Sequence, residues 1–148
     1  MRAVLTRVKS ASVSVEGKTI GQIGQGFLIL LGITHEDTEV QAVKLAEKLV
    51  GLRIFEDEAG KMNRGLETVN GEILVVSQFT LYGNCKKGRR PDFLAAARPE
   101  VAIPLYEKFV ELCREKGFRT ETGEFGAYMQ VDSLNDGPLT LVVDTDQL

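Results

Sequence analysis

Apolar and polar residues alternate regularly near the start of the chain. Residues 2–8 and 10–15 each follow a period of two, which is typical of strands with one buried face. The sequence Glu16-Gly17-Lys18 favours a hairpin turn into another strand over residues 19–23. The run Phe27–Leu31 is apolar without interruption, which indicates a strand buried on both faces. The chain is therefore expected to open with strands.

Two later segments have the spacing of amphipathic helices. Thr34, with an acid at Asp37, has the pattern of a capping box and predicts a helix over about residues 37–50. A second helix is expected to end at Lys116-Gly117, because glycine suits the left-handed position that follows a helix. Pro104 either opens this second helix or kinks it.

The remaining elements are predicted to be strands, mostly joined by hairpins. They cover residues 53–55, 72–78, 118–122, 127–133 and 139–144. Asn135–Pro138 has turn chemistry and is expected to join the last two. This order predicts one α+β domain over residues 1–148, in which a curved, barrel-like antiparallel sheet carries two helices.

Composition narrows the class of protein. The chain has 148 residues, 43% of them apolar and 26% charged, which excludes a disordered tail, a collagen-like repeat and a coiled coil. Its net charge of −3 argues against coating nucleic acid by bulk charge, although a local basic patch is compatible with it. The first residues lack a signal-peptide pattern, and the apolar run noted above is far shorter than the ~20 residues that span a bilayer. We expect a cytoplasmic protein.

Cysteine and histidine are scarce. Cys85, Cys113 and His35 are the only such residues, too few for a four-ligand structural zinc site. We expect no metal and no cofactor. The cysteines are expected to be free thiols in a reducing compartment. His35 falls inside the predicted capping box and is interpreted as a surface residue at a helix start.

The segment Ser77–Gly83 gathers polar groups where a buried strand ends. Strand alternation would place Ser77 and Phe79 on one face, with Gln78 and Thr80 on the other. Such a cluster either lines a pocket or is a strand running out into a polar loop.

A basic loop follows this segment. Four of the 18 basic residues fall within five positions, where uniform spacing predicts about 0.6. These residues are Lys86, Lys87, Arg89 and Arg90. In an acidic protein the enrichment suggests a loop that faces phosphates, and a solvated loop is the alternative.

The whole chain resembles the D-aminoacyl-tRNA deacylases of the bacterial and eukaryotic type, the D-tyrosyl-tRNA(Tyr) deacylase family. Ser77–Leu81 is similar to the S-Q-F-T-L motif of that family, and Asn135–Thr140 to its N-x-G-P-[V]-T motif. The opening Met1–Val4, with Arg7 and Val8, is similar as well. Leu139 is a departure, since the family commonly has Val there.

The resemblance implies a homodimer with its active site at the subunit interface. It implies that Gly137-Pro138 is a cis peptide that reaches from one subunit into the pocket of the other, where its carbonyls surround the α-carbon of the amino acid. A D-residue or glycine would fit, and an L side chain would meet the backbone. The implied reaction is hydrolysis of the ester between a D-amino acid and tRNA, a form of translational proofreading, with glycyl-tRNA as a second substrate.

The resemblance also implies roles for individual residues. Those assigned to substrate binding and chiral selection are Gly137, Pro138, Leu139, Thr140 and Met129. Ser77, Gln78, Phe79 and Thr80 would form the catalytic segment, and the basic loop would contact tRNA. Thr80 is the obvious nucleophile, but no base is evident, so the ribose 2′-hydroxyl is expected to assist instead. A non-catalytic tRNA- or DNA-binding dimer and a general esterase are the alternatives.

Overall fold

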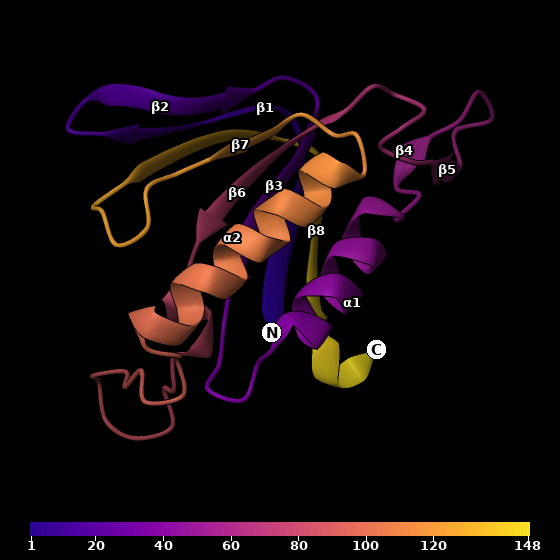
Figure 1. Ribbon diagram of the computed structural model, residues 1–148. Coiled ribbons are helices and arrows are strands. Elements are labelled where there is room, and N and C mark those ends of the chain that lie inside the picture. Colours follow the sequence, from indigo (N-terminus) through magenta and orange to yellow (C-terminus); the bar gives the residue numbers. More distant parts are fainter.

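The computed structural model describes residues 1–148, and six of its strands form one sheet. These strands are β1 (Arg2–Val15), β2 (Lys18–Ile23), β3 (Gly26–Gly32), β6 (Glu72–Ser77), β7 (Thr120–Thr122) and β8 (Gln130–Asp144). Their order is β2-β1-β3-β6-β7, and β8 pairs with the free side of β1. A separate hairpin of β4 (Phe55–Glu56) and β5 (Met62–Arg64) projects from one end (Figure 1).

The sheet is mixed, which corrects the antiparallel prediction. β3 pairs in parallel with β6, and β6 pairs in parallel with β7. Parallel neighbours need a long crossover, and here the two helices provide it. α1 (Glu39–Val50) lies between β3 and β6 in the chain, and α2 (Pro99–Glu115) lies between β6 and β7.

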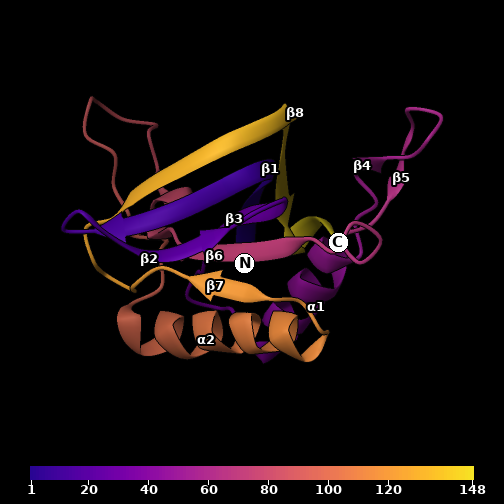
Figure 2. The same ribbon diagram turned by 90° about the horizontal axis from the view of Figure 1, so that it is seen from above.

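The sheet curls until its two ends nearly meet, as the barrel-like prediction required. β2 and β7 approach so closely at Gly21 that a Cβ atom there would lie 2.7 Å from the carbonyl oxygen of Thr122. Figure 2 shows the strands following one another from β8 to β7, with α2 outside them. A side chain at Gly21 would therefore push the two ends of the sheet apart.

β3 is buried on both faces, as its apolar run predicts. Phe27, Ile29 and Leu31 belong to the larger core, which lies under the two helices. Leu28 belongs to a second cluster on the other face of the sheet, together with Leu74 of β6. The two helices lie side by side over the sheet in Figure 1. No helix is long and apolar enough to cross a membrane.

The first helix begins later than predicted. Its N-cap is Thr38, which forms a capping box with Gln41, and Thr34 is not the cap. The Asp37 carboxylate does accept a hydrogen bond from the Thr34 N–H at 2.8 Å, but it also binds the Met1 ammonium at 2.8 Å. Asp37 therefore orders the turn before the helix and the N-terminus, a contact that local sequence does not indicate.

The second helix ends as predicted and begins before Pro104. Pro99 occupies the first turn and Pro104 lies inside the helix. The C-cap is Lys116, and Gly117 follows with a φ of +93°. Of the two alternatives for Pro104, the structure excludes that it opens the helix.

β8 is one strand rather than two strands joined by a turn. It pairs with β1 along its length, with Asn135 opposite Val8 and Thr140 opposite Thr6. Residues 136–139 therefore bulge out opposite a single residue, Arg7. Glycine and proline suit a bulge as well as a turn, which is why the pattern predicts the wrong connection.

Candidate active site

The segment predicted to be catalytic forms a short turn at the end of β6. Ser77 is the last residue of β6, and the Gln78 N–H donates to the carbonyl of Leu31 at 2.8 Å. A 3₁₀ turn, η1 (Phe79–Tyr82), follows at once. Its first hydrogen bond runs from the Leu81 N–H to the Gln78 carbonyl at 3.2 Å. The N–H groups of Phe79 and Thr80 precede this bond, so they have no partner within the turn and are available to an anionic group.

Thr80 has one side-chain partner, and that partner is not a base. Gln78 Nε2 donates to Thr80 Oγ1 at 2.5 Å, so the Thr80 hydroxyl proton points elsewhere. His35 is bound in another place, with its Nε2 at 2.6 Å from the carbonyl oxygen of Leu94. The structure thus joins the predicted residues Gln78 and Thr80, and it supplies no general base to make Thr80 a nucleophile.

Phe79 presents an aromatic surface beside these groups. Its side chain is 54% exposed, although phenylalanine is usually buried. Its ring meets Phe93 edge to face, with centroids 5.3 Å apart and an interplanar angle of 76°. One side of the ring therefore packs on protein, and the exposed remainder is available to a base or another flat group.

Arg2 holds the far end of η1, and sequence reasoning did not single it out for this role. Its Nη1 donates to the Leu81 carbonyl at 2.8 Å, and its Nε donates to Asp144 at 2.9 Å. Its guanidinium lies 4.6 Å from the centre of the Tyr82 ring. Burial, reinforced by the carboxylates of Asp37 and Asp144, raises the pKa of Tyr82 far above its usual range, so this ring stays neutral.

Asn135 and Thr140 close the neck of the β8 bulge. Asn135 Oδ1 accepts from the Leu139 N–H at 3.0 Å, and Asn135 Nδ2 donates to Thr140 Oγ1 at 3.1 Å. Thr140 Oγ1 in turn lies 3.4 Å from Thr6 Oγ1 on β1. The Gly137-Pro138 peptide at the tip is cis, as the resemblance implied, and both residues are exposed.

Arg7 supports the bulge from beneath. It is 6% exposed, and its Nε donates to the carbonyl of Asp136 at 3.0 Å while Nη1 donates to the carbonyl of Ile54 at 2.5 Å. Gly137 has a φ of +128°, and a Cβ atom there would lie 2.8 Å from Arg7 Nη2. Only glycine therefore fits above this guanidinium. Arg7 belonged to the resemblance, but nothing local predicted this contact.

The two motifs are not together within one chain. Arg2 contacts η1 and Arg7 contacts the bulge. The two arginines lie on the same strand, and their spacing corresponds to roughly 17 Å along β1. Met129 lies elsewhere again, half-buried against the second core cluster, with its sulfur close to Gly123. Half-buried Leu139 packs against the larger core.

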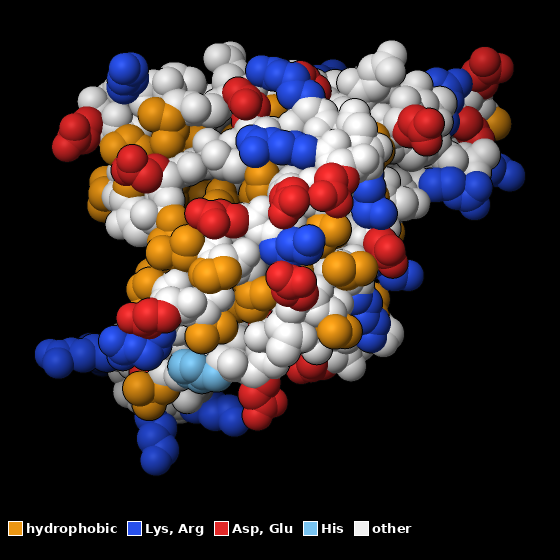
Figure 3. Space-filling view, in the orientation of Figure 1, with side chains coloured by type: hydrophobic (Ala, Val, Ile, Leu, Met, Phe, Trp, Pro, Cys, Tyr) orange, Lys and Arg blue, Asp and Glu red, His pale blue; other side chains and the backbone are white.

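The basic loop, residues 85–91, follows η1 after Gly83 and Asn84, and all its residues are exposed. Asn84 and Asp92 close its base with two backbone hydrogen bonds of 2.8 and 3.0 Å. The ion pairs of the protein involve none of the four loop cations. In Figure 3 Lys and Arg side chains project from this end of the molecule, at the lower left.

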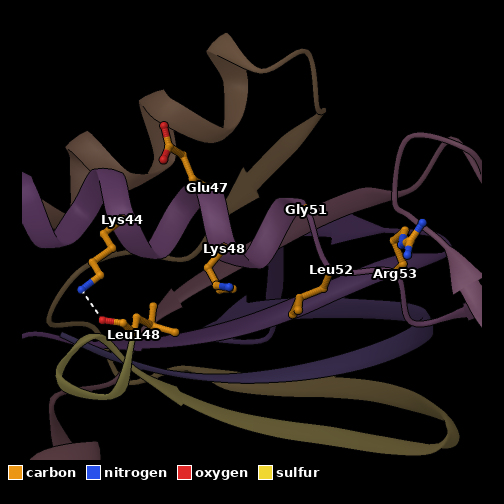
Figure 4. Close-up of a pocket in the computed structure, with 7 residues that line it drawn as sticks. All are labelled: Lys44, Glu47, Lys48, Gly51, Leu52, Arg53 and Leu148. Carbon is orange, nitrogen blue, oxygen red and sulfur yellow. Dashed lines mark hydrogen bonds between the residues drawn. The ribbon is translucent and has the colours of Figure 1, made fainter.

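One cavity lies away from all these residues. It has a volume of about 560 Å³ and is located between α1 and the C-terminus (Figure 4). In Figure 4 Lys44 reaches the carbonyl oxygen of Leu148, at 2.6 Å. A different cavity, of about 480 Å³, includes Gly137 and Arg7 but no residue of the Ser77–Thr80 segment.

Comparison with known proteins identifies the family of this chain. The family model for D-Tyr-tRNA(Tyr) deacylase matches residues 4–144. A protein from Thermus aquaticus named D-aminoacyl-tRNA deacylase is 59% identical, with 99% of this chain and 97% of that one covered. A protein of the same name from Thermosipho africanus is 55% identical, with 100% and 99% covered.

Two solved structures have the same fold. The c-Myc DNA unwinding element binding protein has a TM-score of 0.90 and 44% identity, covering 98% of this chain and 99% of that one. A probable eukaryotic D-amino acid tRNA deacylase has a TM-score of 0.82 and 20% identity, covering 96% and 97%. The match of the family model over most of the chain, together with the full-length relatives, shows that this chain belongs to the D-Tyr-tRNA(Tyr) deacylase family.

Proposed function

We propose that this protein hydrolyses the ester bond of D-aminoacyl-tRNA and releases the free D-amino acid and tRNA. The observation that carries the proposal is identity of 59% to a D-aminoacyl-tRNA deacylase across nearly the whole chain. Both motifs that such a reaction would use are present, in segments with well-defined supports. The reaction is a hydrolysis, so water adds to the carbonyl carbon and the ribose oxygen leaves with a proton.

The backbone at Phe79 and Thr80 suits the charged intermediate of this reaction. Ester hydrolysis develops negative charge on the carbonyl oxygen, and the two N–H groups are not engaged by η1. One such preorganised donor is typically worth about 3 kcal/mol of transition-state stabilisation. Catalysis therefore rests on main-chain donors, and the role of Gln78 is to orient the Thr80 hydroxyl.

Water is activated by the substrate rather than by a protein base. Thr80 has no titratable hydrogen-bond partner, and His35 is bound to Leu94. The 2′-hydroxyl of the terminal ribose neighbours the ester and can orient or deprotonate the attacking water. This division of labour leaves orientation and charge stabilisation to the protein.

Handedness is judged by the main chain of the β8 bulge. Gly137 and Pro138 present backbone at an exposed tip, and Arg7 and Asn135 hold the segment from behind. In a D-aminoacyl group the hydrogen on the α-carbon faces this surface and fits against it. In an L-aminoacyl group the side chain takes that position and clashes with the backbone. Glycine has no side chain on either side, so glycyl-tRNA is also a substrate.

The complete site requires a second copy of the chain. Within one chain the bulge lies far from η1, at the opposite end of the first half of β1. Between them Val142 on β8 is 66% exposed and pairs with Val4 on β1, so the sheet has an apolar face there. A homodimer that covers this face would bring the bulge of one subunit to η1 of the other.

The RNA part of the substrate would lie along the basic loop. Lys86, Lys87, Arg89 and Arg90 are exposed and free of ion pairs, as phosphate-binding side chains must be. The terminal adenine would pack on the exposed face of Phe79, a contact worth roughly 1–3 kcal/mol. Aminoacyl-tRNA is made and consumed in the cytoplasm, where we expect the protein to act.

One comparison favours a second candidate function. A protein 44% identical to this chain is described as a DNA unwinding element binding protein. A non-catalytic dimer that binds nucleic acid would also use the basic loop. The free N–H groups at η1 would then have no role, which makes this candidate weaker. A general esterase is the third alternative, and it would not need the loop.

The test compares three measurements on the intact protein. We expect rapid release of D-tyrosine from D-Tyr-tRNA, little hydrolysis of a simple aryl ester, and weak binding to duplex DNA. Tight DNA binding without hydrolysis would support the binding protein instead. Fast turnover of the aryl ester would support the general esterase.

A further inference from the structure

Phe93 connects the basic loop with the catalytic turn. It directly follows Asp92, whose backbone pairs with Asn84 to close the loop. Its ring packs against the ring of Phe79 at 5.3 Å. An aromatic contact therefore links the end of the loop to η1, in addition to the covalent link through Gly83 and Asn84 at its start.

Gly83 allows this contact to be close. A Cβ atom at Gly83 would lie 3.0 Å from the Phe93 ring and 2.9 Å from the carbonyl oxygen of Thr80. Gly83 N–H also donates to that carbonyl at 2.9 Å. The Phe93 ring thus borders both the aromatic side chain of Phe79 and the backbone turn that holds Thr80.

The segment after Phe93 is fixed at its other end. Thr34 Oγ1 donates to the carbonyl of Ala95 at 2.6 Å, and the Ala97 N–H donates to the carbonyl of Ile33 at 2.9 Å. The chain is therefore held on both sides of Phe93, by the pairing of Asn84 with Asp92 before it and by these two hydrogen bonds after it. The ring contact between Phe93 and Phe79 links this segment to η1.

The exposure of the two rings agrees with a contact that adjusts. Phe93 is 37% exposed, so the pair lies at the surface and is not locked in a core. The segment from Gly83 to Ala97 carries four cations and one acid, Asp92, which favours binding of a polyanion.

We propose that Phe93 is a positioning residue through which RNA binding at the basic loop sets Phe79 and the N–H groups of Phe79 and Thr80. The inference rests on the proposed function and deepens it. The preferred substrate is an aminoacyl group on a polynucleotide, and the same ester on a free nucleoside reacts more slowly once bound. Phe93 itself touches no reacting atom.

The kinetic test measures single-turnover rates at saturating protein for D-Tyr-tRNA and for the D-tyrosyl ester of adenosine. We expect the wild-type protein to react faster with the tRNA, and Phe93→Ala to reduce this ratio of rates by about tenfold, which is less than the roughly 10²-fold that a displacement of about 1 Å can cost. Affinity for tRNA and its salt dependence should change by less than about twofold, because the loop cations remain.

Leu94→Ala is the matched control. Leu94 is the next residue, is 82% exposed and should leave the ratio unchanged. Phe93→Leu retains an apolar contact without the aromatic edge and should lie between the wild type and Phe93→Ala. If Phe93→Ala does not fold, the ratio of rates in Phe93→Leu is compared with that of the wild type instead. An unchanged ratio in a folded Phe93 variant, or an equal change in Leu94→Ala, overturns the proposal.

A second readout does not depend on hydrolysis. In protein labelled with fluorophenylalanine, an acceptor-stem RNA that lacks the terminal adenosine should shift the Phe79 fluorine resonance, although no adenine can reach that ring. The shift should vanish in Phe93→Ala while RNA binding persists. If the RNA does not shift the Phe79 resonance of the wild-type protein, the inference is overturned. If the shift is present but the protein does not hydrolyse D-Tyr-tRNA, only the proposed function is overturned.

Discussion

The turn after β6 and the bulge in β8 both take an arginine from β1, but they use it differently. At η1, Arg2 is partly exposed, donates to the Leu81 carbonyl and lies over the Tyr82 ring, and it does not contact the N–H groups of Phe79 and Thr80. At the bulge, Arg7 is buried and binds carbonyls from two segments. One region keeps its donors free, and the other has its supporting polar groups paired.

This difference fits two distinct tasks. A region that stabilises developing charge needs unpaired donors, because a donor already bonded has little to give an oxyanion. A region that excludes one enantiomer needs a surface that does not retreat. The contrast suggests that changes at η1 alter rate, and that changes beneath the bulge alter discrimination and stability.

The largest effect should come from the substrate and not from the protein. Replacing the terminal adenosine of D-Tyr-tRNA by 2′-deoxyadenosine should reduce the rate by about 10³-fold, the scale typical of a lost acid–base group. Tyrosine release under single-turnover conditions measures this. Retention of normal rates would mean that a protein group activates water and that η1 is more than a set of donors.

The second-largest effect is expected from substituting Arg7, which supports the β8 bulge. Arg7→Met removes the donor from the partly buried Asp136 carbonyl and from the buried Ile54 carbonyl, and the buried unpaired carbonyl alone costs about 1–3 kcal/mol of unfolding free energy. The same variant should hydrolyse L-Tyr-tRNA faster relative to D-Tyr-tRNA than the wild type does. Arg64→Met, which lines the same cavity but is partly exposed, is the control. Equal stability and equal discrimination between D- and L-Tyr-tRNA in both variants would show that Arg7 does not support the bulge.

Neutralising the basic loop should weaken binding without changing handedness. Replacing Lys86, Lys87, Arg89 and Arg90 by alanine should flatten the slope of log affinity against log salt by about 3, since each phosphate contact to a single strand contributes about 0.7. The variant Lys44→Ala/Lys48→Ala removes cations from α1 and should leave the slope unchanged. An unaltered slope in the loop variant would assign the loop to solvent.

Thr80→Ala should have a small effect on rate, less than about tenfold, because the backbone N–H remains and no base activates the hydroxyl. Steady-state kinetics on D-Tyr-tRNA decides this. A loss of several orders of magnitude would indicate that Thr80 acts as a nucleophile, and that η1 contributes more than backbone donors.

The smallest effect concerns the anchor of η1 at low pH. Burial raises the pKa of Asp144, but hydrogen bonds from the Asp146 N–H and Arg2 outweigh it, so the pKa lies below its usual value of 3.8. The carboxylate therefore stabilises the fold above about pH 4, and this contribution disappears as pH falls through the lowered pKa.

Asp144→Asn should accordingly reduce the unfolding free energy at neutral pH by about 1 kcal/mol, and the difference from wild type should close in strong acid. Urea denaturation at several pH values measures it. Glu111→Gln, in an exposed pair with Lys108, should show no such pH dependence. A difference that persists at the lowest pH would mean that Asp144 acts through packing and not through its charge.

Sequence pattern predicts the elements well and their connections less well. The alternation in residues 2–15 and the apolar run Phe27–Leu31 identify β1 and β3, because burial on one or two faces leaves a direct trace. Thr34 fits a capping pattern, but the helix is capped by Thr38, and Asp37 binds the Met1 ammonium as well as the Thr34 N–H. Parallel pairing depends on where the helices cross, which no local pattern records.

The candidate site divides in the same way. The residues from Ser77 to Thr80 and the Gly137-Pro138 tip are contiguous in sequence and carry a pattern of their own. Their supports, Arg2 and Arg7, act over separations of 79 and 129 residues. Pairing across such distances is set by the register of β1 with its neighbours, so the sequence alone does not indicate it.

If the main chain of the β8 bulge sorts the two mirror-image esters, the protein must distinguish D- from L-tyrosine on one and the same tRNA. Release of the two enantiomers is therefore measured from the same tRNA under the same conditions. We expect rapid release of D-tyrosine and negligible release of L-tyrosine. Comparable rates for the two enantiomers would contradict it.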